Sequence, residues 1–284
     1  MSAVHELTVV MGDPGFEGPV PRGPKTSVLP LEAIASIDVR LSKSHYFVFT
    51  SASELELVAP LVHAANSVHR LRTLFVRADV ACTWFLPMFE RANLRTLRNT
   101  LLHTDPAVPQ RVITAWQMGA QDQLIADATV FEDRLFVRNC ALDSFEVSFR
   151  DVPALARMPV AERADFVIDK DGSYLYWEAS DTHVGLEMIR FAIDPAFREA
   201  SLVRKLAFDQ RFGRAVRAIR TASGLRQTDI PGLSARQVAR IEAGSVTPRY
   251  ETLRKMAAAH SLTVSDYLDS VAKHLAALSP GSAD

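Results

Sequence analysis

Glycine and proline divide the stretch from Gly224 to Leu253 into segments that are too short for anything except a small helical unit. Apolar residues recur at helical spacing before Gly224, and a glycine at that point can end a helix in a left-handed cap. Pro231 and Gly232 then predict a turn, because proline disfavours helix in the residue before it. Gly244 ends the next segment. The apolar positions of the first helix are Phe212, Ala215, Val216 and Ile219.

The segment that begins at Ser234 is predicted to be the exposed helix of this unit. Ser234 is a favourable N-cap, because its hydroxyl accepts a hydrogen bond from a free amide of the first turn. Val238 and Ile241 are spaced to point inward, and Thr247 followed by Pro248 opens another helix. The polar residues left to point outward are Arg236, Gln237 and Arg240.

Short motifs follow one another in order across this stretch. They are G-L-x-Q at 224–227, G-x-S at 232–234, I-E-x-G at 241–244 and T-L at 252–253, with Val238 and Pro248 between them. Their order resembles the lambda-repressor-like helix-turn-helix of the Cro and xenobiotic-response-element regulators, over residues 208–270. Gln227 and Ser234 stand a few residues closer together than in that family, so the second helix is expected to be truncated.

The resemblance implies which side chains meet the edges of the bases in the major groove of DNA. They are Ala235, Arg236 and Arg240, with Gln237 beside them. The side-chain chemistry agrees, because an arginine fork can meet both acceptors of guanine.

The resemblance also implies contacts to phosphate, from Gln227 and Ser234. Such contacts position a helix on DNA without reading its sequence. Arg226, Arg249 and Lys255 are either further phosphate partners or solvated surface charges.

Charge is distributed unevenly along the chain. Residues 211–274 contain eleven lysine or arginine residues and five acidic residues, a net charge of +6, whereas the whole chain has a net charge of −1. The remainder therefore carries −7. A basic segment on an acidic body is typical of a protein that meets a polyanion at one end.

Composition and hydropathy exclude several classes of protein. The chain has 284 residues, of which 48% are apolar and 23% charged, as in ordinary globular domains. No uncharged apolar run approaches the roughly 18 residues of a membrane helix, and the first residues lack the basic start of a leader peptide. We therefore expect a cytoplasmic protein. Cys82 and Cys140 form no C-x-x-C motif, so neither a disulfide framework nor a zinc site is predicted.

Three domains are expected: an α/β domain at 1–128, a small α+β domain at 129–205 and an all-α helix-turn-helix domain at 206–284. In the first domain, strands are predicted at 45–50, 73–76 and 112–116, and helices at 53–69 and 87–102. Their alternation indicates a partly parallel sheet. Arg91, Arg95 and Arg98 on one face of the second helix form either an accessory basic surface or a solvated one.

The middle domain combines strands with short helices. Alternating apolar residues indicate strands near 135–137 and 145–149, and Asp171-Gly172 supplies the positive φ of a hairpin turn between 166–169 and 174–178. Helices are predicted at 152–158 and 184–192.

The run D-G-S-Y-L-Y-W-E-A-S-D at 171–181, with Leu186 and Ile189 beyond it, resembles a small bacterial domain of uncharacterised function. That domain also occurs joined to a C-terminal lambda-repressor-like domain, and the resemblance covers residues 129–195. Tyr174, Tyr176 and Trp177 are either core residues or an aromatic pocket. His183 has no second ligand at metal-binding spacing, so we interpret it as structural.

Signals for catalysis, cofactors and metals are poor. G-P-V-P-R-G-P-K-T at 18–26 differs from a phosphate-binding loop, because prolines replace the free amides that would hold phosphate. Motifs for nucleotide, metalloprotease and serine hydrolase sites are missing from the sequence. No catalytic, cofactor or metal residue is predicted.

The C-terminal segment carries a short heptad pattern. Its apolar positions are Val264, Leu268, Val271, Leu275 and Leu278. They form either a seam between two copies of the chain or a last helix folded onto its own domain.

These patterns together predict a sequence-specific DNA-binding transcriptional regulator, with repression as the default outcome. Double-stranded DNA is the expected partner and a homodimer the expected assembly, with residues 1–128 available to sense a ligand, bind a protein or dimerise. One alternative is an antitoxin or mobile-element control protein whose N-terminal region binds a protein partner. Another is an enzyme domain tethered to DNA.

Overall fold

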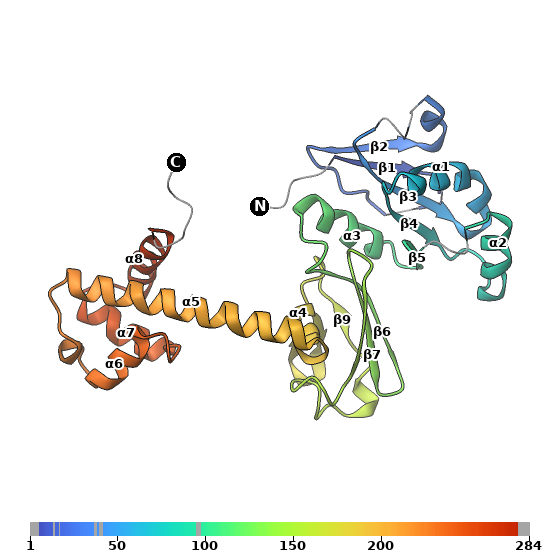
Figure 1. The fold of residues 1–284 in the computed structure, drawn as a ribbon. Helices are drawn as coiled ribbons and strands as arrows, with labels where there is room; N and C mark the ends of the chain where they lie inside the picture. Colours follow the sequence, from blue (N-terminus) through green and yellow to red (C-terminus); the bar gives the residue numbers. More distant parts are fainter. Residues whose placement is uncertain are drawn as a thin grey trace. The chain divides into compact units, whose positions relative to one another are not determined.

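The computed structural model describes residues 6–13, 15–16, 18–36, 39, 42–94 and 98–277. The chain divides into two compact units, Met1–Ile193 and Asp194–Asp284, called here the N-terminal and C-terminal units. It is a multidomain protein of mixed α/β content with one parallel sheet (Figure 1). None of the described helices is long and apolar enough to cross a lipid bilayer.

A five-stranded parallel sheet forms the first half of the N-terminal unit, in the order β2-β1-β3-β4-β5. The strands are β1 (Leu7–Met11), β2 (Thr26–Pro30), β3 (His45–Ser51), β4 (Leu71–Arg77) and β5 (Thr100–His103). The predicted strands at 45–50 and 73–76 are confirmed, whereas β1, β2 and β5 were not predicted as strands. The central strand β3 is buried on both faces, which explains its nearly continuous apolar run.

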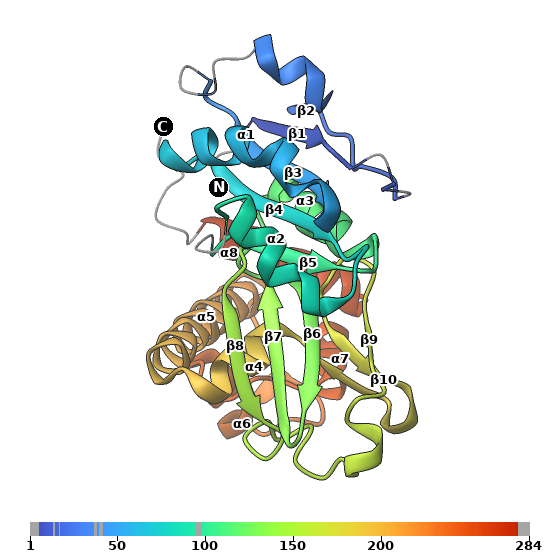
Figure 2. The ribbon, with the colours of Figure 1, turned by 90° about the vertical axis from the view of Figure 1, so that its right-hand side faces the viewer.

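Helices cover both faces of this sheet. They are α1 (Leu55–Ser67), α2 (Phe85–Arg91) and α3 (Ala107–Met118), with short 3-10 turns η1 (Leu31–Ser36), η2 (Ala52–Glu54) and η3 (Cys82–Trp84). Figure 2 shows α1 and α2 on one face and α3 on the other. Successive strand residues point to opposite faces, so Val48 packs toward α1 while Phe47 and Phe49 pack toward α3.

The structure corrects two predictions for this half. Residues 112–116 were predicted as a strand but lie within α3, whose C-cap is Gly119 in the left-handed conformation at φ 68°. The predicted helix at 87–102 ends at Arg91, because Asn93 has a φ of 55° and β5 begins at Thr100. The prediction that Arg91 and Arg98 share one face of a helix is therefore wrong. Arg95 lies outside the described residues.

The second half of the N-terminal unit is antiparallel. It contains β6 (Ile125–Phe131), β7 (Arg134–Asn139) and β8 (Ser144–Ser148), then β9 (Val167–Ile168), β10 (Leu175–Trp177), β11 (Thr182–Val184) and the helix α4 (Leu186–Ile193), with the 3-10 turns η4 (Val160–Glu162) and η5 (Glu178–Ser180). The predicted strands and hairpin are confirmed, with Gly172 at φ 82°. Trp177 is 1% exposed in the core, in agreement with a packing role.

Two further predictions need correction here. Residues 152–158 form turns rather than a helix, although Val152 and Leu155 are buried as apolar residues of a helix would be. The expected boundary between residues 128 and 129 falls inside β6, whose residues pair with β7 on both sides of that point. Cutting the chain there would therefore divide a paired strand.

The C-terminal unit is entirely helical among its described residues. It contains α5 (Pro195–Ala222), the 3-10 turn η6 (Gln227–Asp229), α6 (Ala235–Glu242), α7 (Tyr250–Ala259) and α8 (Val264–Ala277). The expected domain boundary at 205/206 lies inside α5, whereas the two compact units divide between Ile193 and Asp194. The N-cap of α5 is Asp194, whose side chain accepts from the Phe197 amide at 3.0 Å, and Pro195 is the first residue of the helix.

One apolar core joins α5, α6, α7 and α8. Its fully buried members include Val216, Val238, Ile241, Met256 and Tyr267. The predicted inward positions of the segment after Ser234 are thus confirmed. Between Gln227 and Ser234 the chain forms only the short turn η6, in agreement with the short helical segment expected there.

Candidate nucleic-acid interface

The start of α6 is fixed by a reciprocal cap. The Ser234 hydroxyl accepts from the Gln237 amide at 3.2 Å, and the Gln237 side-chain oxygen accepts from the Ser234 amide at 2.8 Å. The Ser234 hydroxyl also donates to that same oxygen, at 3.0 Å. This capping box satisfies two amides that the first turn of a helix otherwise leaves free. The predicted N-cap is confirmed, but both side chains make internal hydrogen bonds where contacts to DNA were expected.

The outward face of α6 carries two arginines. Val238 is fully buried and Ile241 is 3% exposed, which turns Arg236 and Arg240 to the opposite side, where both are exposed. Neither guanidinium makes a hydrogen bond or ion pair with any residue that the structure describes. Ala235, half-buried at the first position, adds little bulk beside them. Two unpaired cations thus stand next to each other on one short helix.

A hollow brings a third arginine to this face. A cavity of about 240 Å³ lies between α6 and the start of α7, and its lining includes Arg240, Pro248 and Arg249. Arg249 is exposed at the N-cap position of α7 and makes no side-chain cap. The structure thus joins Arg249, which the sequence left as either a phosphate partner or a surface charge, to the same surface as Arg240.

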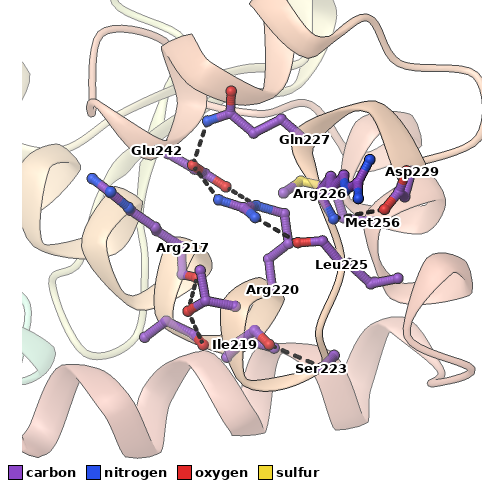
Figure 3. Close-up of polar contacts among 12 residues, drawn as sticks. Arg217, Ile219, Arg220, Ser223, Leu225, Arg226, Gln227, Asp229, Glu242 and Met256 are labelled. Atoms are coloured by element: carbon purple, nitrogen blue, oxygen red, sulfur yellow. Dashed lines mark hydrogen bonds and ion pairs between the residues drawn. The ribbon is translucent and has the colours of Figure 1, made fainter.

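A buried ion pair holds α6 against α5. Arg220 of α5 is 8% exposed and Glu242 of α6 is 7% exposed. The Arg220 Nε donates to Glu242 Oε1 at 2.5 Å, its Nη2 donates to Oε2 at 3.0 Å, and its Nη1 donates to the Leu225 carbonyl at 2.6 Å (Figure 3). Hydrogen bonding to Glu242 raises the pKa of Arg220 above its ordinary value. A bidentate pair of this kind fixes both distance and orientation.

Gln227 belongs to this buried network. Its side-chain amide donates to Glu242 Oε2 at 2.7 Å, as Figure 3 shows. We expected Gln227 to hold a phosphate, and its amide nitrogen instead ties η6 to α6. Sequence reasoning missed Arg220 and Glu242 as partners, because they lie 22 residues apart.

Two glycines let the helices approach closely. A Cβ at Gly213 would lie 2.5 Å from the carbonyl oxygens of Ile241 and Glu242, and one at Gly244 would lie 2.6 Å from the backbone of Gln210. Gly244 also has a φ of 69°, which favours glycine. Only glycine fits this crossing of α5 with the end of α6.

The remaining basic candidates are more weakly placed. Arg226 is exposed before η6, and its backbone amide donates to the Asp229 carboxylate at 2.7 Å. Lys255 donates to the Gly232 carbonyl at 3.2 Å, which attaches it to the turn before α6. Arg226 thus precedes the turn that Pro231 begins, whereas Lys255 reaches that turn from α7.

The last helix folds back onto its own unit. Val271 is buried in the core, and Val264 and Leu275 pack against the same core. Leu268 is 38% exposed, and Leu278 lies outside the described residues. This packing favours the folded-back interpretation of the heptad pattern for the residues described.

The N-terminal unit holds no metal cluster among the described residues. His183 is exposed and contacts the rings of Tyr174 and Tyr176, at centroid distances of 4.8 and 4.4 Å. Cys140 is a free, buried cysteine whose pKa is raised by burial to about 12, so its thiol stays protonated. A cavity of about 680 Å³ does lie in this unit, beside α3.

Comparison with known proteins adds no assignment. No protein-family model matches the sequence, and no curated protein matches it.

Proposed function

We propose that the C-terminal unit is a lambda-repressor-like helix-turn-helix domain that binds a specific site on double-stranded DNA, and that the protein regulates transcription. The observation that carries the proposal is that Arg236 and Arg240 are both exposed and form no ion pair with any described residue, on a helix whose other face packs in the core. In the proposed complex α6 lies in the major groove. Its arginine forks donate hydrogen bonds to the two acceptors of guanine, each good bidentate contact contributing about 1–3 kcal/mol of discrimination.

Contacts to phosphate position this helix. Arg249 shares the hollow with Arg240, and Arg226 lies before the turn, so both are suited to phosphates beside the groove. The net charge of +6 over residues 211–274 strengthens attraction to the polyanion. Gln227 and Ser234 act through the fold, because their side chains hold η6 and the start of α6 in place.

A single unit of this size reads only a few base pairs. We propose that two copies bind two half-sites about one helical turn apart, as two-fold regulators do. We also propose that the protein is cytoplasmic, where it meets the chromosome, and that it represses nearby genes. The antitoxin alternative uses the same DNA-binding face and differs in predicting a protein encoded nearby that co-purifies with the N-terminal unit.

The test is footprinting of the purified full-length protein over fragments of its own genomic neighbourhood. Arg236→Ala should relax preference at one base position of the protected site. Lys273→Ala is the matched control, because Lys273 is an exposed cation of α8 that is neither on α6 nor in the lining of the hollow beside Arg240. Equal losses from the two variants, or equal losses on every sequence, would contradict the assignment of base readout to α6.

Salt dependence gives a second measurement. The logarithm of affinity should fall linearly with the logarithm of salt concentration, with a slope of about −0.9 per phosphate neutralised. Arg249→Ala should weaken binding to all sequences alike and reduce that slope by about one unit. An unchanged slope would remove Arg249 from the phosphate contacts.

A further inference from the structure

The carboxyl edge of the parallel sheet is the place where such sheets bind ligands, above all where the strand order reverses. Here the reversal lies between β1 and β3. Asp13, directly after β1, pairs there with Arg77 at the end of β4, with Nε to Oδ2 at 2.7 Å and Nη2 to Oδ1 at 2.8 Å. The Asp13 side chain is 1% exposed. Asp13 and Arg77 neutralise each other, so neither charge at this point is left for a ligand to pair with.

A larger opening lies farther along the same edge, after β5. A cavity of about 680 Å³ is bounded by the end of β5, the first turns of α3, Asp127 of β6, and β9. A second hollow of about 400 Å³ adjoins it and shares Gln110, Arg111 and Lys170 as lining residues. Figure 1 shows α3 between the parallel sheet and strands β6 and β7. Volumes of this size are typical of small-molecule sites.

Arg111 is a buried cation in this wall. It is 6% exposed, and its Nε and Nη2 both donate to one acceptor, the Ala126 carbonyl, at 3.1 and 2.9 Å. It forms no ion pair with a carboxylate in the part of the chain that the structure describes. Burial lowers the pKa of Arg111, which reports an environment that disfavours its charge. A buried charge of this kind is costly unless an opposite charge accompanies it.

The acidic residues of the cavity are engaged elsewhere. Asp105 accepts from the Ala107 amide at 2.8 Å, and Asp127 accepts from the Ala128 amide at 2.9 Å. Both are exposed, so solvent screens their attraction for Arg111. The first turn of α3 offers little to an anion, because Asp105 occupies the Ala107 amide and Pro109 has no N–H. Among the described residues of this wall, the Arg111 guanidinium is therefore a cation without a partner carboxylate.

Around Arg111 the cavity combines one more cation with apolar surface. Lys170, on the turn between β9 and β10, is exposed and makes no ion pair with any described residue. Leu102 is 43% exposed and Val167 is 62% exposed, and both line the cavity that Arg111 and Lys170 line. Large apolar side chains left open beside cations favour a ligand that is charged at one end and apolar at the other.

We propose that this cavity binds a small organic acid, with its carboxylate or phosphate on Arg111 and Lys170 and its apolar body against Leu102 and Val167. The site lies wholly within the N-terminal unit. The inference does not depend on DNA binding, so the two proposals can fail separately.

Isothermal titration of the full-length protein without DNA tests this proposal. The probes are benzoate and phenyl phosphate, which share an aromatic ring and differ in the acid group, and benzamide, which keeps the ring without the charge. We expect saturable binding of at least one acid with a Kd on the order of 1 mM and much weaker binding of benzamide. Binding of benzamide as tight as that of the acids, or no saturable binding of either acid, would overturn the proposal.

Variants locate the site without removing the buried arginine. Lys170→Ala should raise the Kd of the bound acid about threefold, and Val167→Asp, which adds a negative charge to an exposed wall position, about tenfold. Lys43→Ala is the control, because Lys43 is an exposed lysine of the same unit outside the cavity lining. Arg236→Ala should leave the Kd unchanged. Equal Kd values for Lys170→Ala, Val167→Asp and the control would show that the acid binds outside this cavity, which would overturn the proposal.

Discussion

Glu242→Ala is predicted to destabilise the C-terminal unit far more than removal of an exposed carboxylate. The substitution leaves Arg220, which is 8% exposed, without its carboxylate, and removes the acceptor of Gln227. Breaking a buried ion pair from one side costs about 3–5 kcal/mol. In a domain of this size about 1 kcal/mol corresponds to roughly 4–8 °C, so the Tm should fall by roughly 12 °C or more.

The two units can be followed separately in one thermal experiment. Trp84, Trp116 and Trp177 are the three tryptophans of the chain and all lie in the N-terminal unit, whereas the described part of the C-terminal unit is helical. Far-UV circular dichroism should therefore show a lower Tm for the helical unit of the Glu242→Ala variant. The unfolding midpoint followed by tryptophan fluorescence should not change.

A matched control and a double variant complete the test. Glu251 pairs with Arg254, but the two side chains are 64% and 63% exposed, so Glu251→Ala should cost only about 0–1 kcal/mol. The double variant Arg220→Met with Glu242→Leu should recover much of the loss, because apolar side chains can replace a buried ion pair. A Tm for Glu242→Ala equal to that of Glu251→Ala, or no recovery in the double variant, would refute the reasoning.

Three further outcomes are expected. Ser234→Ala should lower the stability of the C-terminal unit by about 1 kcal/mol in denaturant titration, and Ser234→Asp should retain most of it, since aspartate also caps. Gly213→Ala should cost about 1–3 kcal/mol, because its Cβ would lie 2.5 Å from two carbonyl oxygens; an unchanged midpoint would show that the helices can separate freely. Burial lowers the pKa of His103 below its ordinary value of 6.5. As the pH drops, the imidazole is therefore protonated in the unfolded chain before it is protonated in the folded one. The stability of the N-terminal unit should fall as the pH drops below about 6.5. His103→Phe should flatten this dependence, and a slope identical to wild type would refute it.

Local signals in the sequence were sufficient to predict most of the helices and turns of the C-terminal unit. Ser234 and Gly244 mark the ends of α6 by caps that depend on a few neighbouring residues, and Val238 and Ile241 fix its buried face. The outward direction of Arg236 follows from those positions. The orientation of a short helix can therefore be predicted when its caps and its apolar spacing agree.

Partners that lie far apart in sequence could not be predicted in this way. Gln227 meets Glu242 across 15 residues, and Asp13 meets Arg77 across 64. The segment 112–116 was misread because a short apolar run fits a strand and a buried helix equally well. Gly119, the left-handed C-cap of α3, is the local signal that could have decided for helix.

The two sides of α6 differ in what they contact. One side, with Val238, Ile241 and Glu242, packs in the interior, while the guanidinium groups of Arg236 and Arg240 make no hydrogen bond or ion pair with any described residue. Substitutions at the outward positions should therefore be nearly neutral for stability while they change whatever α6 meets in solution. An arrangement of this kind lets a lineage acquire new targets by single substitutions without first acquiring spare stability.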